Sequence, residues 1–156
     1  MSEVIKRRRN YSKIALSPEQ ARDFLDSQTW LRLATLDSEE QIWNLPSQFV
    51  RLGDSIFFDE NPESVILQHI ERNPNVCGVV DTGYSYDDLV GTIIQGDASL
   101  VEDRETIDQI ITSMTDKYKM LTNRPPVQDF SNRKFVKVKP YNDFEILSWN
   151  FGKGHL

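Results

Sequence analysis

Residues 30–59, WLRLATLDSEEQIWNLPSQFVRLGDSIFFD, decide the fold of this chain, because they contain three apolar runs separated by turn residues. The runs cover residues 30–36, 42–52 and 55–59, and the intervening segments 37–41 and 53–54 are polar or contain glycine. Short apolar runs at this spacing are typical of strands joined by tight turns. The stretch therefore predicts three consecutive antiparallel strands.

The second of these strands is predicted to be broken internally by a proline, Pro46. Proline has no backbone N–H to donate to a strand ladder, so within sheets it occurs at edges and bulges. We therefore expect the sheet to be opened at Pro46, where a ligand can approach the backbone.

The remaining chain predicts further strands with a few helices between them. Ser17, Pro18 and Gln20 form a capping box at the start of a helix that ends near Ser27. Apolar periodicity predicts a second helix that follows residues 61–64 and ends near Arg72, and a third over 104–121. Strands are expected over residues 76–81, 89–102, 134–139 and 144–149. The sum is a mainly β chain, an antiparallel barrel of six or seven strands with helices packed outside.

The composition favours one soluble globular domain. The chain has 156 residues, which suits a single core, and its net charge of −6 argues against a general attraction to nucleic acids or membrane surfaces. Cys77 is the one cysteine, which excludes an intramolecular disulfide and a multi-cysteine metal site and favours a cytoplasmic location. No apolar run is long enough to span a bilayer, and the N-terminus lacks the apolar core of a signal peptide.

We divide the chain into a basic N-terminal arm, residues 1–14, and a single domain, residues 15–156. The arm carries four consecutive basic residues at positions 6–9, KRRR. It is interpreted either as a contact with phosphate, in a nucleic acid or in a cofactor between subunits, or as a solvated terminus.

Few side chains suggest chemistry on their own, and none identifies a catalytic residue. His69 and His155 have no second ligand at metal-like spacing, so neither a metal site nor a Ser/His/Asp triad is expected. Cys77 is interpreted as a small core residue. The three tryptophans are candidates either for stacking on a flat cofactor or for packing, and two loop tyrosines are candidates for lining a substrate entrance. These are Trp30, Trp43 and Trp149, and Tyr84 and Tyr86.

The order of short motifs resembles the pyridoxamine 5′-phosphate oxidase-like family of flavin-binding split barrels. The pieces that carry the resemblance are RLATLD (32–37), LPSQFV (45–50), IFF (56–58), NPNV (73–76), QGDASLVE (95–102), KY (117–118), VKP (138–140) and SWNFGK (148–153). The resemblance implies a Greek-key split barrel that forms a homodimer, with cofactor grooves between the two subunits.

The same resemblance implies the cofactor and its contacts. Most of the family binds FMN, one branch uses a deazaflavin, and hydride passes between the ring and a small organic substrate. Backbone groups of residues 45–48 would contact the edge of the ring. The other implied contacts are the ribityl chain, the phosphate, and the ring or dimer seam. The full set of implied cofactor residues is Leu45, Pro46, Ser47 and Gln48 at the ring edge, Phe58 and Asp59 at the ribityl chain, Ser64 at the phosphate, and Gln95 and Trp149 at the seam.

The sequence departs from the family pattern at the phosphate. The family places Ser-Arg-Lys at the start of the second helix, where this chain has Ser64, Val65 and Ile66. Ser64 and the helix N-terminus remain available to an anion, and Arg51, Arg133 or the partner's basic arm are the possible substitutes for the lost cations. Without a substitute, the resemblance implies a split-barrel binding or structural protein that has lost tight cofactor binding, or that takes haem or another planar ligand in the same groove.

A second departure concerns the substrate. True pyridoxamine phosphate oxidases carry a further C-terminal segment with an Arg and a Trp, whereas this sequence ends seven residues after Trp149. We therefore do not expect oxidation of pyridoxamine phosphate.

Overall fold

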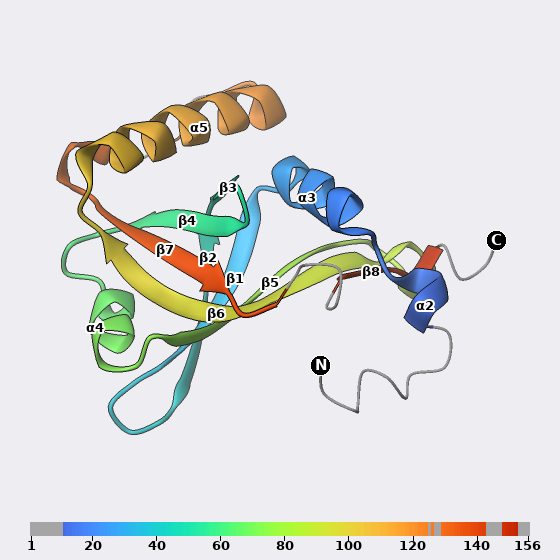
Figure 1. Cartoon of the computed structure of the whole chain (residues 1–156), viewed down its shortest axis with the longest axis horizontal. Helices are drawn as coiled ribbons and strands as arrows, with labels where there is room; N and C mark the ends of the chain where they lie inside the picture. Colours follow the sequence, from blue (N-terminus) through green and yellow to red (C-terminus); the bar gives the residue numbers. More distant parts are fainter. Residues whose placement is uncertain (1–10, 125, 127–128, 143–147, 153–156) are drawn as a thin grey trace.

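The computed structural model describes residues 11–124, 126, 129–142 and 148–152. These residues form eight strands of one antiparallel sheet, in the order β2-β1-β5-β6-β7-β4-β3, with β8 paired to β6 (Figure 1). The strands are β1 (Trp30–Leu36), β2 (Ile42–Gln48), β3 (Val50–Leu52), β4 (Ser55–Glu60), β5 (Asn75–Thr82), β6 (Val90–Val101), β7 (Lys134–Pro140) and β8 (Ser148–Asn150). The helices are α2 (Tyr11–Ile14), α3 (Pro18–Ser27), α4 (Val65–Arg72) and α5 (Arg104–Thr122), with short 3₁₀ turns at Tyr86–Asp88 and Phe130–Asn132.

The two edges of the sheet are consecutive in sequence, which makes the sheet a half-barrel. β2 pairs with β1 at one edge, β3 pairs with β4 at the other, and the single residue Phe49 joins β2 to β3. The chain therefore changes partner strand at Phe49, and this position is called the Phe49 corner below.

The prediction for residues 42–52 was wrong in one respect, because the strand breaks at Phe49 and not at Pro46. Pro46 lies within β2, opposite Arg32 of β1. β2 is an edge strand with a neighbour on one side only, which is where a proline is tolerated in a sheet. The change of partner strand divides the predicted segment into β2 and β3 instead.

The helices pack outside the curved sheet, as predicted. In Figure 1, α5 lies along one side of the sheet above β4 and β7, and α3 lies beside β3. The capping box at Ser17 is present, with the Gln20 backbone N–H donating to the Ser17 hydroxyl at 3.2 Å. The core beneath the helices is apolar, and its largest fully buried side chains include Phe49, Phe58 and Tyr118.

Two glycines allow β6 to bend and to serve three neighbours. β6 pairs with β5, β7 and β8, and Gly96 pairs with both Val76 and Pro140. A Cβ atom at Gly96 would collide with the Lys139 carbonyl, and one at Gly91 would collide with the Trp149 ring. Neither position leaves room for a side chain, so the close approach of the neighbouring groups requires glycine at both.

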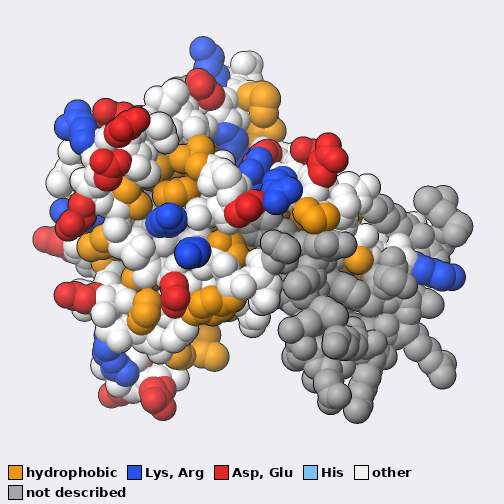
Figure 2. All heavy atoms as spheres, viewed as in Figure 1, with side chains coloured by type: hydrophobic (Ala, Val, Ile, Leu, Met, Phe, Trp, Pro, Cys, Tyr) orange, Lys and Arg blue, Asp and Glu red, His pale blue; other side chains and the backbone are white. Residues whose placement is uncertain are grey.

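Two sequence predictions fall partly outside the described residues. Of the strand expected over 144–149, residues 143–147 are not described, and β8 begins at Ser148. Of the arm, residues 1–10 are not described, and residues 11–14 form α2. Over the face drawn in Figure 2, acidic and basic side chains are intermixed, with apolar side chains between them.

Candidate functional site

The Phe49 corner is held by two neighbouring side chains of α5. Phe49 lies outside both strand ladders, so its backbone groups need other partners. Its N–H donates to the Tyr118 hydroxyl at 2.9 Å, and its carbonyl accepts from Lys117 Nζ at 3.0 Å. The Tyr118 hydroxyl in turn donates to the Thr29 carbonyl. Helix α5 thus supplies hydrogen bonds that the sheet does not provide at the point where the half-barrel turns.

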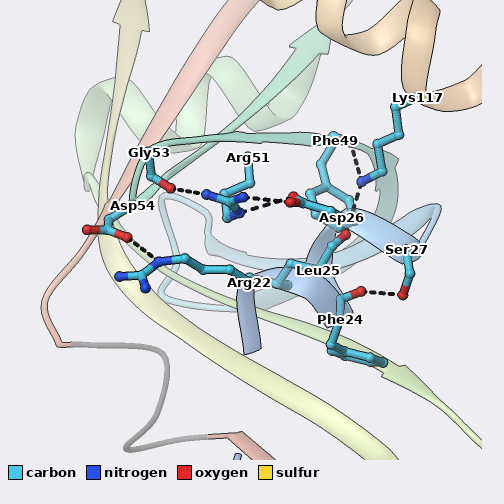
Figure 3. Close-up of polar contacts among 10 residues, drawn as sticks. All are labelled: Arg22, Phe24, Leu25, Asp26, Ser27, Phe49, Arg51, Gly53, Asp54 and Lys117. Atoms are coloured by element: carbon cyan, nitrogen blue, oxygen red, sulfur yellow. Dashed lines mark hydrogen bonds and ion pairs between the residues drawn. The ribbon is translucent and has the colours of Figure 1, made fainter. Parts of the chain in front are cut away.

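Lys117 is a buried cation with a complete set of acceptors. Its Nζ also donates to the Leu25 carbonyl at 3.1 Å and lies 3.7 Å from the centroid of the Phe49 ring (Figure 3). Burial lowers the pKa of Lys117 from 10.5 to about 8, the negative charge of Asp26 opposes that change, and the positive charge of Arg51 adds to it. The sequence carries a signal for this role, because Lys117 interrupts the apolar face of its helix between Met114 and Tyr118. Sequence reasoning did not use that signal.

The predicted ring-edge residues lie along β2, directly before the Phe49 corner. Leu45 is half-buried opposite Leu33, Pro46 is exposed, and Ser47 is buried, with its hydroxyl donating to the Gln48 carbonyl at 3.2 Å. The Gln48 side-chain oxygen Oε1 is buried and has no hydrogen-bond partner. A buried amide oxygen without a partner is costly, so it is suited to accept from a ligand N–H or O–H.

The predicted ribityl residues lie on β4 and differ in orientation. The Phe58 side chain is fully buried in the core, so only its backbone is available to a cofactor. The Asp59 side chain is 1% exposed, and its Oδ2 accepts from Arg133 Nε at 2.6 Å. The other carboxylate oxygen, Oδ1, is buried without a partner.

Ser64 lies at the predicted phosphate end, where it caps α4. Its hydroxyl accepts from the Ile66 backbone N–H at 3.2 Å. The pKa of the nearby Glu60 carboxyl is raised, mainly by burial, while a hydrogen bond from the Ser64 side chain and the charge of Arg133 oppose the change. Of the two positions where the family has cations, Val65 is partly exposed and Ile66 is buried.

The arginines considered as substitutes for those cations are each bound to a carboxylate of this chain. Arg51 donates to Asp26 through Nε at 3.0 Å and Nη2 at 2.6 Å, and through Nη1 to the Gly53 carbonyl at 2.5 Å (Figure 3). Arg133 is bound to Asp59. The third possible substitute, the basic arm, lies outside the described residues at positions 1–10.

The two residues assigned to the ring or seam, Gln95 and Trp149, lie on other strands. Gln95 lines a surface groove of about 370 Å³ on the face of β1, β5 and β6 that carries Ala34, Leu36 and Cys77. Trp149 covers Gly91, and its indole N–H is buried without a partner. Since β4 and β8 are not neighbours in the sheet, one protomer does not present Asp59 and Trp149 from adjacent strands.

Among the described residues, three buried side-chain atoms lack a hydrogen-bond partner, and all three belong to residues that the resemblance assigned to the cofactor. Most buried polar atoms in folded proteins are paired, so such atoms are expected where a ligand completes the bonding. They are Gln48 Oε1, Asp59 Oδ1 and Trp149 Nε1.

The histidine and cysteine that were considered have local partners or ordinary surroundings. The His69 ring is buried, with Nδ1 2.9 Å from the Thr35 hydroxyl, and it contacts the Trp43 ring. Within the described residues no cluster of three potential metal ligands occurs. Cys77 is half-buried, which raises the pKa of its thiol.

The aromatic candidates divide between exposed and packed positions. Tyr84 and Tyr86 are exposed, as expected for loop residues, and the Tyr86 ring stacks on Phe151 with centroids 4.6 Å apart. Trp30 is partly exposed at the start of β1.

Comparison with known proteins identifies the family. A family model described as pyridoxamine 5′-phosphate oxidase matches residues 17–142. The chain therefore belongs to the pyridoxamine 5′-phosphate oxidase-like split-barrel family, as its sequence motifs indicated. No match was found among curated protein sequences. The described helices include none that is long and apolar enough to cross a membrane.

Solved structures share the fold at low sequence identity. A conserved hypothetical protein from Mycobacterium tuberculosis matches with a TM-score of 0.78 and 20% identity, over 95% of this chain and 93% of the other. A haem storage protein from Vibrio cholerae matches with a TM-score of 0.68 and 18% identity, over 88% and 99%. An FAD-binding protein from Mycobacterium smegmatis matches with a TM-score of 0.62 and 18% identity, over 82% and 92%. Proteins that share this fold therefore include a haem storage protein and an FAD-binding protein.

Proposed function

We propose that this protein binds the tricyclic ring of FMN or of a deazaflavin, and that it supports hydride transfer to or from a small organic substrate. The observation that carries the proposal is the coincidence between the three unpartnered buried atoms and the residues assigned to the cofactor by sequence. Membership of a family with flavin-binding members agrees with it.

The ring end of the proposed site has the donor and acceptor groups that such a ring requires. A flavin or deazaflavin ring carries carbonyls and an N–H on one edge, which suits the Gln48 side-chain oxygen and the Trp149 indole N–H as partners. When bound, the ring supplies the two-electron chemistry, and the protein supplies orientation and shelter from water. Gln48 is positioned for this role because the next residue, Phe49, is fixed by Lys117 and Tyr118.

We propose a homodimer with the cofactor groove between subunits, because Asp59 and Trp149 lie on strands that are not neighbours in the sheet of one protomer. The groove that Gln95 lines offers an apolar surface for this contact, and its Ile42 side chain is 73% exposed. Analytical ultracentrifugation at micromolar concentration tests this step. Twice the chain mass of 18.1 kDa is expected, and sedimentation as a monomer would contradict the dimer.

The second candidate is a split-barrel binding protein without tight flavin binding. The observation that favours it is that Arg51 and Arg133 are both bound to carboxylates, so neither is an uncommitted cation for a phosphate. The similarity to a haem storage protein extends this candidate to haem or another planar ligand.

Titration of the purified apoprotein separates the two candidates. FMN, the deazaflavin cofactor and haem are added in turn, and ring fluorescence or haem absorbance reports binding. Saturation by a flavin or deazaflavin at micromolar concentration supports the first candidate. Gln48→Met should then weaken ring binding by about tenfold, because one hydrogen bond is lost. Gln41→Met, at an exposed position, is the matched control. Saturation by haem alone, or by none of the three, supports the second candidate.

A further inference from the structure

At the end of the proposed site away from the ring, one carboxylate oxygen of Asp59 has no hydrogen-bond donor. The Asp59 side chain is almost fully buried, and its Oδ1 has no partner although Oδ2 is bound to Arg133. A carboxylate oxygen accepts hydrogen bonds and does not donate them. A hydroxyl group of a ligand completes this bonding, whereas a phosphate dianion offers no proton and repels the carboxylate.

The groups that would bind an anion at the start of α4 are already engaged within the chain. The Ser64 hydroxyl accepts from the Ile66 N–H at 3.2 Å, and the interaction of the Ser64 side chain with Glu60 opposes the rise in the pKa of that carboxyl. Glu60 follows Asp59 directly on β4, and Glu63 precedes Ser64. A carboxylate of the protein therefore lies beside the position where the family holds the cofactor phosphate.

The charges around this end are unfavourable for a dianion. Three acidic residues, Asp59, Glu60 and Glu63, lie at the end of β4 and in the loop that follows, and two basic residues lie at the start of the paired strand β7 and just before it. One of these cations, Arg133, is bound to Asp59, and the other, Lys134, is exposed opposite Glu60 in the β4–β7 ladder. FMN carries a phosphate charge of about −1.5 to −2 at neutral pH, which adds repulsion here.

We infer that, given the proposed ring-binding function, the site selects a ring whose tail ends in hydroxyl groups and not in a phosphate. Riboflavin is the probe of this class, since it shares the ring and the ribityl chain with FMN and lacks the phosphate. Asp59 accepts from a ribityl hydroxyl, and Glu60 excludes the phosphorylated tail.

Competitive titration of the apoprotein with riboflavin and FMN tests the inference through quenching of ring fluorescence. Riboflavin is expected to bind at least about tenfold more tightly than FMN. Equal or tighter binding of FMN overturns the inference while leaving the proposed function intact. Failure of both to bind overturns the inference, and failure of the deazaflavin cofactor to bind as well overturns the proposed function.

The salt dependence gives an independent readout. Raising the salt concentration from about 0.01 M to about 1 M shortens the Debye length from about 30 Å to about 3 Å. FMN affinity should rise over this range, because repulsion is screened, whereas riboflavin affinity should stay within about twofold. A fall in FMN affinity with salt would show that the phosphate is held by cations and would overturn the inference.

A variant that removes the charge of Glu60 tests whether this residue disfavours FMN relative to riboflavin. Glu60→Gln should improve FMN binding by about fivefold to tenfold and leave riboflavin binding within about twofold. Glu71→Gln is the matched control, because Glu71 is exposed on α4 away from its start. An equal gain in both variants would contradict a specific role for Glu60, and circular dichroism confirms that each variant folds.

Discussion

Two buried charges, Lys117 on α5 and Asp59 on β4, differ in how completely their bonding is satisfied. Lys117 donates to two carbonyls and lies over the Phe49 ring. Asp59 has one oxygen bound to Arg133 and the other without a partner. A fully bonded buried charge stabilises one arrangement of the chain, whereas a half-bonded one retains capacity for a ligand. Lys117 therefore belongs to the part of the molecule that stabilises the half-barrel, and Asp59 belongs to the part that is proposed to bind the cofactor.

The largest effect on unfolding free energy should come from removing the fully bonded charge of Lys117. Lys117→Ala leaves a cavity and removes donors from the Leu25 and Phe49 carbonyls, so unfolding free energy should fall by about 3–4 kcal/mol. Urea denaturation measures the loss. Lys119→Ala, an exposed change two residues along α5, should stay within about 0.5 kcal/mol. Similar losses in the two variants would contradict the role given to Lys117.

The buried lysine should also make stability depend on pH in the alkaline range. Its pKa is about 8 in the folded chain and 10.5 when unperturbed. Between these values the unfolded chain keeps a proton that the folded chain has lost, so stability rises with pH. A pKa difference of this size corresponds to about 3 kcal/mol.

A comparison of wild type with Lys117→Met isolates this contribution. Tyr118, whose pKa is raised by burial, is present in both chains and cancels. The unfolding free energy of wild type, relative to that of the variant, should increase as pH rises from 8 to 10.5. A difference that stays constant over this range would contradict the buried, perturbed lysine.

Tyr118→Phe sharpens the comparison at the same corner by removing one hydroxyl. That hydroxyl accepts from the Phe49 N–H and donates to the Thr29 carbonyl. The loss should be about 1–2 kcal/mol in unfolding free energy. Tyr84→Phe, on a fully exposed side chain, is the control and should change little in thermal denaturation.

The smallest effect on unfolding free energy is expected for a substitution at Glu60, next to Asp59 on β4. The raised pKa of Glu60 means that its ionised form is disfavoured in the folded chain, so its contribution to stability declines as pH rises through its titration. Glu60→Gln should therefore change unfolding free energy by less than about 0.5 kcal/mol at neutral pH, with a sign toward stabilisation. A large destabilisation in chemical denaturation would show that Glu60 is a structural partner.

Sequence reasoning succeeded where the determinants are local. The capping box at Ser17 and the proline on an edge strand follow from properties of single residues or short spacings. The motif order identified the family.

The features that sequence missed depend on residues far apart in the chain. The break at Phe49 follows from a change of partner strand, and its hydrogen bonds come from a residue 69 positions away. The pairings of Arg51 with Asp26 and of Arg133 with Asp59 likewise span 25 and 74 positions. No local pattern distinguishes an arginine that is bound in this way from one that is available to a phosphate. The sequence alone therefore could not predict that both arginines are paired with carboxylates.

The Phe49 corner also orders the events of folding. A nascent chain forms the β1–β2 and β3–β4 hairpins from adjacent residues, and those contacts close quickly because their loops are short. The backbone groups of Phe49 bond to Lys117 and Tyr118, which are synthesised 68 and 69 residues later. We therefore expect closure of the half-barrel to be a late step of folding, because these contacts join residues far apart in the chain.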